Sequence, residues 1–422
     1  MKRTLLSLTA ALLAVFSFCS CEKSHENDPN TDKVYKTVPV YLTKTQNELV
    51  TSGNVFAFDF FRAMVARSEG EGVLVSPFSL QAALSMLANG AEAETYKEIV
   101  KALGWEGYSI EDVNSLYSRL TGGLREADDQ VTLEIANSAW TQKDFPILDS
   151  YISGLKENYD AEAKSVDFTS PSTLSQINKW CSDKTHGLIP QMLDNLNPYT
   201  RLMLINALYF KGTWQKEFDK KKSGNAKFTS SKGTTKMRFM NDTRDCLGLY
   251  TESFKLCEIP YGGGLFTFDV ILPDERTDID KFVEGMDDDF WASCRTKMRA
   301  YEVDFSLPAF TQDYSSEENI IPFLKERGMR RAFDDGEEAQ FGKISPKHLF
   351  VGEILQKTLI KTDEKGSEAA AVTEIGVRVG SALGPDVVIE VPKMTFKADR
   401  PFFYILREQS SGTILFIGIF RG

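Results

Sequence analysis

The chain has 422 residues, of which 42% are hydrophobic, and its formal net charge is −11 at pH 7. A chain of this length and apolar content can bury a sizeable core. The negative charge argues against nucleic-acid binding, because phosphate backbones are bound by clustered cations. The one basic run of note, residues 220–222, is better explained as a solvated turn than as a polyanion site.

Residues 1–20 have the pattern of an export signal. Lys2 and Arg3 precede an apolar stretch over residues 5–18, which is too short to span a bilayer as a permanent helix. The stretch ends in Phe-Cys-Ser-Cys, which is similar to a bacterial lipoprotein cleavage site and predicts lipidation of Cys21; an ordinary secretory signal is the alternative. We therefore expect an exported lipoprotein at the cell envelope, periplasmic or on the cell surface, attached to the membrane through the lipid anchor alone.

Residues 21–45 are expected to form a lipidated tether, because they are polar and show no hydrophobic period before residue 38. No later linker and no internal repeat interrupts residues 46–422, which we interpret as one folding unit. Its four cysteines match no metal-binding spacing, and neither a metal nor a cofactor is expected. Cys246 and Cys257 either pair across a hairpin or remain buried free thiols.

Periodicity and turn residues predict both helices and strands in the folding unit. Helices are predicted at residues 54–67, about 77–88, 94–103, after 146 to 159, 172–186 and 323–329. Strands are predicted at residues 73–75, 133–140, 201–214, 258–261, 265–272, 301–310, 350–362, 402–407 and 413–420. Residues 202–210 are almost wholly apolar, as in a strand covered on both faces. Asn206 interrupts them, and a buried amide there needs partners.

Residues 363–378 combine alanines with β-branched residues in a period-two pattern. One face has only small or apolar side chains, namely Ser367, Ala369, Ala371, Thr373, Ile375 and Val377, and the other face carries the charges. This pattern is typical of a strand with one buried face. Residues 380–385, which follow, are turn formers without periodicity. A potential central strand joined to an exposed loop suggests a loop that can become a strand.

Residues 364–371, Glu-Lys-Gly-Ser-Glu-Ala-Ala-Ala, closely resemble the hinge of the serpin family of protease inhibitors, and residues 396–405 resemble its C-terminal signature. The resemblance covers residues 46–422 in order. It implies an α+β serpin fold with a large central mixed β-sheet, two smaller sheets, surrounding helices and an exposed reactive-centre loop at about residues 364–390. The implied hinge residues are Glu364, Gly366, Ser367, Glu368, Ala369, Ala370 and Ala371.

The same resemblance implies a region where the central sheet opens. Ser76 and Ser79 belong to a Ser-Pro-x-Ser turn that would lie beneath the sheet, and Ser79 also fits a plain helix cap. Residues 204–214 resemble the central strand of the family. This places Asn206 in the opening region and Trp214 at the point where the hinge first joins the sheet.

Two positions depart from the family pattern. Gln356 stands where serpins commonly have a histidine before the hinge strand, so pH-dependent control from that position is in doubt. Ala309 stands where many have a lysine, so Glu364 is expected to lack its usual ion-pair partner. Both changes are expected to affect gating of the loop more than the fold.

Family spacing from Glu364 places the scissile bond between Gly380 and Ser381. Small and β-branched neighbours suit elastase-like or subtilisin-like serine proteases, while Arg378–Val379 offers a trypsin-like alternative; a cysteine protease is a further alternative target. The resemblance implies a monomeric suicide-substrate inhibitor that traps the protease as an acyl-enzyme. The uncharged face of the hinge favours this over a non-inhibitory serpin acting as a binding or carrier protein, because burying a charge there would be costly.

The chain is not expected to be an enzyme. Its three histidines are His25, His186 and His348, and no Gly-x-Ser-x-Gly elbow accompanies them. His186 falls in the last turn of a predicted helix, where a dipole or backbone contact is favoured over a ligand role. A surface binding module that uses the loop as an adhesive strand is the competing class of function.

Overall fold

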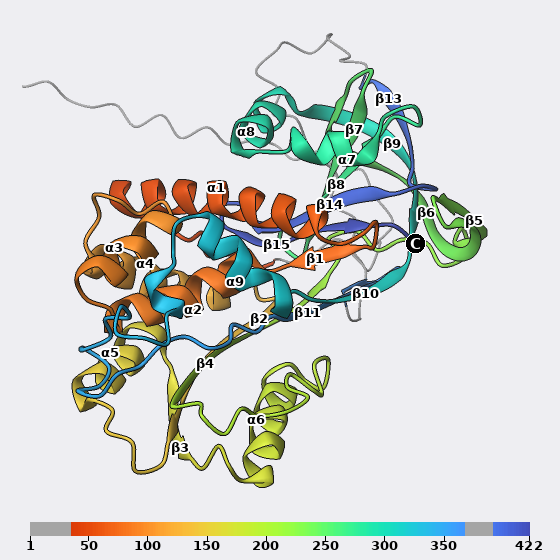
Figure 1. Ribbon diagram of the computed structural model, residues 1–422. Coiled ribbons are helices and arrows are strands. Elements are labelled where there is room, and N and C mark those ends of the chain that lie inside the picture. The colour runs from red at the N-terminus through yellow and green to blue at the C-terminus, as the bar shows by residue number, and fades with distance from the viewer. Residues whose placement is uncertain (1–34, 368–390) are drawn as a thin grey trace, which may run out of the picture.

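The protein is described by a computed structural model that covers residues 35–367 and 391–422 (Figure 1). Its helices are α1 (Lys44–Ala66), α2 (Pro77–Gly90), α3 (Ala93–Ala102), α4 (Ile110–Glu126), α5 (Asp149–Tyr159), α6 (Pro171–Lys184), α7 (Ile279–Glu284), α8 (Asp288–Lys297), α9 (Glu317–Glu326) and the 3₁₀ turn η1 (Arg331–Phe333). Its strands are β1 (Val73–Val75), β2 (Val131–Gln142), β3 (Glu162–Val166), β4 (Leu202–Thr213), β5 (Gly224–Ser230), β6 (Gly233–Tyr250), β7 (Phe254–Tyr261), β8 (Phe266–Pro273), β9 (Arg299–Pro308), β10 (Phe310–Ser315), β11 (Lys357–Thr362), β12 (Gly366–Ser367), β13 (Lys393–Lys397), β14 (Phe402–Glu408) and β15 (Ile414–Phe420).

The strands form three hydrogen-bonded groups. Nine strands follow the order β1-β15-β14-β8-β7-β6-β9-β13, with β5 added on β6. Four strands follow the order β12-β4-β2-β3, and β10 pairs with β11 alone. Parallel pairs (β2 with β3, β9 with β13) occur among antiparallel ones, so the sheets are mixed. The four-stranded and two-stranded groups are the two parts of the central sheet. The long strand β6 pairs with β7 along one part of its length and with β9 along another. It therefore links the two smaller sheets into the single nine-stranded group.

The helix starts follow from their capping residues. Thr43 accepts a hydrogen bond from the backbone N–H of Gln46, and the Gln46 side chain bonds back to the Thr43 N–H, which makes a capping box for α1. Ser76, and not Ser79 as predicted, caps α2 by accepting a hydrogen bond from the N–H of Ser79, and Pro77 occupies the first helical position. These caps fix where the two core helices leave the preceding strand or loop.

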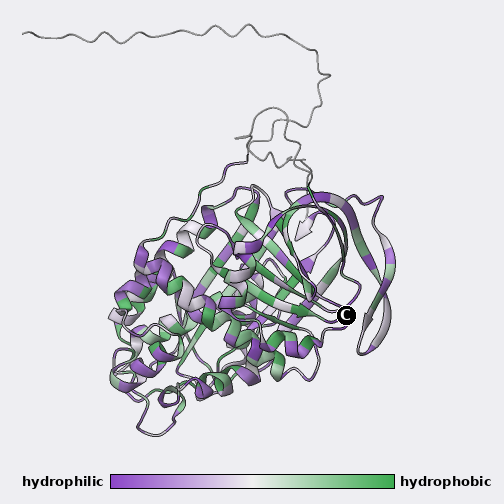
Figure 2. Cartoon of the chain, turned by 90° about the horizontal axis from the view of Figure 1, so that it is seen from above, coloured by the Kyte–Doolittle hydropathy of each residue, from purple (hydrophilic) through white to green (hydrophobic). Residues whose placement is uncertain are grey.

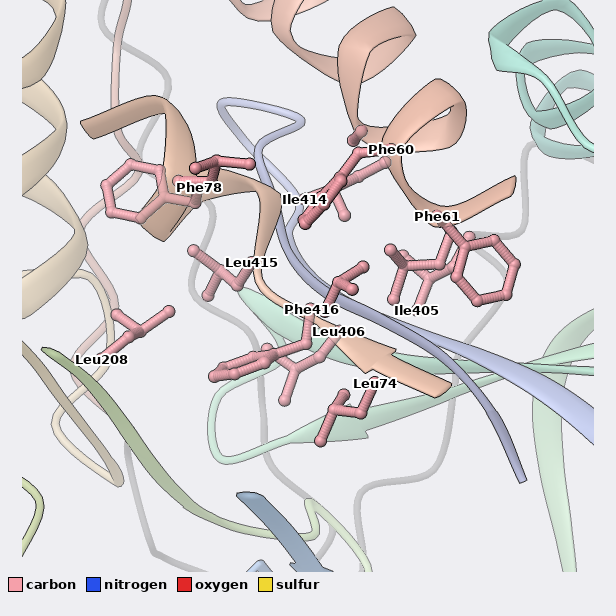
Figure 3. Packing of buried hydrophobic residues seen from close by; sticks show 14 of the residues in the cluster. Phe60, Phe61, Leu74, Phe78, Leu208, Ile405, Leu406, Ile414, Leu415 and Phe416 are labelled. Carbon is pink, nitrogen blue, oxygen red and sulfur yellow. The ribbon is translucent and has the colours of Figure 1, made fainter. Parts of the chain in front are cut away.

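The main core lies where α1 and α2 pack against β14 and β15 (Figure 3). Phe60 and Phe61 of α1 and Leu406 of β14 point into it. Every residue of β14 and of β15 is buried, which requires these strands to be covered on both faces. A second, smaller cluster lies beneath α6 and includes Trp140 and Trp180. The hydrophobic segments accordingly concentrate in interior strands, while the outer helices alternate in hydropathy (Figure 2).

The predicted strand over residues 350–362 is wrong in its first half, since β11 begins only at Lys357. The backbone groups of the preceding segment bond elsewhere. The N–H of Val351 donates to the carbonyl of Ala332 at 2.7 Å, and the carbonyl of Gln356 accepts from the N–H of Ser316 at 3.1 Å. The predicted helix at 323–329 is also misplaced, because α9 spans Glu317–Glu326 and contains Pro322.

Two further observations concern the cysteines and the membrane. Cys181, Cys246, Cys257 and Cys294 are all buried free thiols, so the thiol alternative holds for Cys246 and Cys257 in this structure. Within residues 35–367 and 391–422, no helix has both the length and the apolar character needed to cross a bilayer.

Candidate functional site

The start of the hinge is already joined to the central sheet. Gly366 and Ser367 form β12, which pairs antiparallel with Thr213 and Gly212 at the end of β4. Backbone bonds from Trp214 N–H to the Lys365 carbonyl (2.9 Å) and from Phe218 N–H to the Glu364 carbonyl (2.8 Å) extend this attachment. A tight turn through residues 363–366 connects β11 to β12. The hinge therefore leaves β11 and joins the free edge of β4.

Gly366 and Ser367 fit this position for different reasons. Gly366 has a φ of +142°, and a Cβ there would lie 2.1 Å from the carbonyl oxygen of Gly212, so only glycine allows this approach. The Ser367 side chain is 4% exposed and its hydroxyl lies 3.1 Å from the Tyr261 hydroxyl. Burial raises the pKa of Tyr261, which keeps the phenol neutral beside Ser367. Ser367 thus lies on the buried face, as its place in the period-two pattern predicted.

Trp214 lies where the hinge joins the sheet, as expected. Its ring stacks on Tyr261 with centroids 4.3 Å apart, and its indole N–H donates to the carbonyl of Asp363 at 2.8 Å. The side chain is 1% exposed. Trp214 therefore bonds directly to the turn that leads into the hinge.

The expectation that Glu364 lacks an ion-pair partner is corrected by Arg238 of β6. The Arg238 Nε lies 2.5 Å from the Glu364 Oε1, and the Glu364 side chain is 8% exposed. Ala309 has no cationic side chain to offer, but its backbone N–H bonds to the Arg238 carbonyl at 2.9 Å. The neighbouring strand therefore supplies the guanidinium that neutralises the buried carboxylate.

The predicted opening residues do come together below the hinge. The Ser76 hydroxyl donates to the carbonyl of Leu415 at 2.8 Å, and the Ser79 hydroxyl bonds to the side-chain oxygen of Asn206. The Asn206 amide donates to the side-chain oxygen of Asn137 at 2.7 Å. The Asn137 amide in turn donates to the carbonyl of Tyr159 at 2.7 Å. A chain of polar side chains therefore runs from α2 across β4 and β2 to the end of α5.

Asn137 was not singled out in the sequence, although its signal was present. It interrupts the apolar strand β2 in the way that Asn206 interrupts β4, and the two residues are directly opposite in the strand register. The buried Asn137 amide and the partly buried Asn206 amide share one hydrogen bond, and Tyr159 and Ser79 supply their other partners.

Gln356 binds α2 through both ends of its amide. Its side-chain oxygen accepts from the Ser76 N–H at 3.1 Å, and its nitrogen donates to the Ser76 carbonyl at 2.8 Å. Both groups are buried. Because an amide does not titrate, this contact between the residue before β11 and the N-cap of α2 contains no titrating side chain.

The two parts of the central sheet are not paired with each other over the residues that the structure describes: β11 pairs as a strand with β10, and β4 pairs with β2 and β12. Below Ser367 a small space lies between Phe210 of β4 and Ile360 of β11. At the opposite end of β4 lies a largely apolar cavity of about 340 Å³, lined by Leu202 and Leu204 of β4, by α2, and by residues 348–355. Open space therefore lies beside β4 at both of its ends, and we call the unpaired gap between β4 and β11 the slot.

Several predicted site residues lie outside the described ranges. These are Cys21 and the loop and hinge residues Glu368, Ala369, Ala370, Ala371, Arg378, Val379, Gly380 and Ser381. His186 follows α6, and its contact is with a side chain: its Nε2 lies 2.7 Å from the Glu134 Oε1 of β2.

The central sheet is in two unpaired parts, and the hinge strand β12 covers only one end of the free edge of β4. This arrangement defines a class of protein in which a further strand can pair with that edge. The serpin (serine protease inhibitor) family model matches residues 51–421, and the chain belongs to the serpin family. Family members are protease inhibitors rather than enzymes in general. The sequence-based prediction of family and fold is confirmed.

Individual relatives match along almost their whole length. The leukocyte elastase inhibitor of Equus caballus is 30% identical over 390 residues, covering 88% of this chain and 99% of the relative. Iripin-5 of Ixodes ricinus is 30% identical, covering 90% and 96%. The crystal structure of the thermophilic serpin tengpin in its native state is 30% identical with a TM-score of 0.79, covering 92% and 97%. Thyroxine-binding globulin complexed with thyroxine shares the fold at 24% identity and a TM-score of 0.76, covering 88% and 98%.

Proposed function

We propose that this serpin inhibits serine endopeptidases as a suicide substrate. A protease attacks the loop at about residues 364–390 and forms an acyl-enzyme. The loop segment on the hinge side then inserts between β4 and β11 and carries the bound protease with it. The observation that supports this proposal best is the pairing of Ser367 with Gly212 at the mouth of the slot.

The register of β12 sets where each inserted residue would lie. Continuing from Ser367 opposite Gly212, residue 373 comes opposite Asn206 and residue 377 comes opposite Leu202, the first residue of β4. Side chains alternate along a strand. Since Ser367 faces the core, Thr373 would face the polar chain at Asn206, and Ile375 and Val377 would fill the apolar cavity.

In the same register, the two candidate scissile bonds can be compared with the end of β4. β4 has 12 residues, and its partner strand would end at Val377. Both Arg378–Val379 and Gly380–Ser381 lie just beyond that point, so a cut at either bond releases a strand long enough to pair with the whole of β4. New backbone hydrogen bonds at about 1 kcal/mol each would contribute on the order of 10 kcal/mol. This is comparable to the stability of a domain.

The target class follows from the loop sequence and from the relatives. Elastase-like or subtilisin-like proteases suit a cut between Gly380 and Ser381, trypsin-like proteases suit Arg378–Val379, and cysteine proteases are an alternative. Relatives named leukocyte elastase inhibitor agree with the first assignment. Inhibition needs only one copy of the chain, and we propose a monomer.

The test is to mix the protein with pancreatic elastase, subtilisin and trypsin. We expect an adduct that survives SDS and a released C-terminal fragment that begins at Ser381, identified by mass spectrometry. A loop that is cut without any stable adduct would instead support the non-inhibitory alternative, a binding or carrier protein of serpin fold.

We also propose that residues 1–20 direct export and that Cys21 carries a lipid. The tether predicted over residues 21–45 extends too far, because Thr37 pairs with Asp128, Val40 is buried in the core and α1 begins at Lys44. We therefore propose a tether that ends before Thr37. An inhibitor held at the envelope would face proteases that approach the cell. Mass spectrometry of the N-terminal peptide tests this assignment, because lipidation adds acyl mass at Cys21 and Cys21→Ser abolishes it. An unmodified peptide that starts at another residue would contradict the anchor.

A further inference from the structure

The hairpin of β5 and β6 carries a cationic face on an otherwise acidic protein. Lys227 is directly opposite Lys236 in the strand register, and both side chains are exposed. Thr229 and Thr234, the next facing pair, have their hydroxyl oxygens 3.3 Å apart, so facing side chains on this surface are within contact distance. The other face is buried through Phe228, whose ring packs against Phe420.

The two lysines have no carboxylate partner among the described residues. Lys232 at the hairpin tip, by contrast, is paired with Glu71. Like charges directly opposite each other in an antiparallel pair destabilise the sheet. Lys227 and Lys236 therefore present a positively charged face without a partner among the described residues, and this face is complementary to a negatively charged surface. Lys220 and Lys221, in the turn before β5, are also exposed.

The cationic face lies next to the base of the loop. Arg238 lies two residues beyond Lys236, and residues two apart in a strand point to the same side. The Arg238 side chain reaches Glu364 at the base of the hinge. The cationic face therefore begins beside the root of the loop and continues outward along the hairpin, which projects at the edge of the molecule remote from α3 and α5 (Figure 1). A protease held on the loop would lie next to it.

We propose that the face formed by Lys227 and Lys236 is a docking surface for an acidic patch on the target protease. This inference rests on the proposed function, because the loop must bring the protease to this end of the molecule. Complementary charge at the rim of a contact raises the association rate more than it slows dissociation. The surface would therefore select among proteases of similar cleavage specificity according to their charge.

The test uses the full chain and two probes, an anionic and a cationic trypsin, which cleave after the same residues but carry opposite net charge. Both trypsins can cleave the loop after Arg378, whether or not the serpin then traps them. The variant is Lys227→Glu/Lys236→Glu. The matched control is Lys101→Glu/Lys156→Glu, which makes the same charge change at exposed lysines of α3 and α5. The rate of loop attack, cut plus trapped, is measured at low and at high salt.

With anionic trypsin at low salt, we expect the hairpin variant to react about tenfold more slowly than the control. The difference should vanish at high salt, because exposed charges are then screened. With cationic trypsin the hairpin variant should react no more slowly than the control. Equal rates for variant and control with anionic trypsin overturn the proposal. A hairpin variant that loses heparin binding but reacts with trypsin at unchanged rates also overturns the proposal, because the face would then be a polysaccharide site.

The ratio of serpin that is cut to serpin that is trapped with the protease tests the proposed function separately. A wild type that is only cut, with the charge effect still present, contradicts trapping and leaves the docking surface supported. A wild type that traps trypsin at rates insensitive to charge and salt contradicts the docking surface alone.

Discussion

Arg238 of β6 and Glu364 of the hinge form an ion pair, with the Arg238 Nε 2.5 Å from the Glu364 Oε1. The carboxylate is almost fully buried, while the guanidinium is about half exposed. The pair therefore holds the root of the loop against the sheet next to Trp214. It lies at the mouth of the slot, where insertion begins.

Arg238→Ala should loosen this attachment. The variant leaves the Glu364 carboxylate buried without its cation, at a cost of about 1–3 kcal/mol. We expect a lower unfolding midpoint for the uncut protein and faster formation of loop-inserted monomers or polymers on gentle heating, measured by native gel electrophoresis. Arg238→Lys is the matched control and should retain most of the stability. Heating behaviour identical to wild type in the alanine variant would contradict the role of the pair.

Ser367→Arg should turn the inhibitor into a substrate. The Ser367 side chain is 4% exposed and contacts Tyr261, so an arginine there cannot be buried without removing its charge from water. We expect the protease to cut the loop and leave, with loss of most of the SDS-stable adduct. Ser367→Ala fits the same space and should still trap. Undiminished adduct in the arginine variant would argue against insertion of this face.

Gln356→His should introduce pH dependence at the start of β11. A neutral imidazole can accept the hydrogen bond from the Ser76 N–H, but a protonated one cannot. Relative to wild type at each pH, the variant should lose stability as the pH falls from 8 to 5. Unfolding midpoints across this range measure the difference. A constant offset between the two proteins would show that this contact does not sense protonation.

Glu258 should make the wild type less stable as the pH rises toward neutrality. Burial, with the nearby Asp269 carboxylate, raises the pKa of Glu258 to about 7 from an ordinary value of 4.5, although Arg407 opposes the shift. A raised pKa means that the folded state holds the proton more tightly than the unfolded state. The stabilising contribution is therefore complete below about pH 4.5 and is lost as the pH rises through 7, roughly 3 kcal/mol in total.

Glu258→Gln should remove this contribution from the pH profile of the free energy of unfolding. Glu353→Gln, at an exposed carboxylate, is the control and should leave the profile unchanged. The remaining slope in the Glu258 variant should reflect Asp269, whose pKa is also raised by burial. A profile with the same slope as wild type between pH 4.5 and 7 would contradict the assignment.

The sequence alone predicts the placement of residues that stand out from the local pattern of apolar and charged side chains. Asn206 stands out in an apolar run, and its amide does find Asn137 and Ser79. The cap of α2 is an exception, because it was predicted at Ser79 but lies at Ser76, which precedes a proline and also bonds to β15. Ser367 falls on the uncharged alternate positions, and its side chain is buried. Local pattern carries this information because it reflects burial directly.

The features that the sequence did not predict depend on contacts between residues that are far apart in the chain. Arg238 is 126 residues from Glu364, and no local pattern marks it as the substitute for a lysine missing at Ala309. β6 was not predicted, because its exposed first half has no apolar alternation and its buried positions change phase at Phe239 and Met240. The strand predicted from residue 350 was too long, because its hydrophobic residues line the cavity and its backbone bonds to Ala332. These outcomes are set by tertiary packing.

The most direct measurement of the central claim compares the unfolding midpoint of the protein before and after its loop is cut by elastase. Filling the slot beside β4 should add backbone bonds and bury Ile375 and Val377, so the severed form should melt at a markedly higher temperature. A severed form that melts at or below the midpoint of the intact protein would contradict insertion.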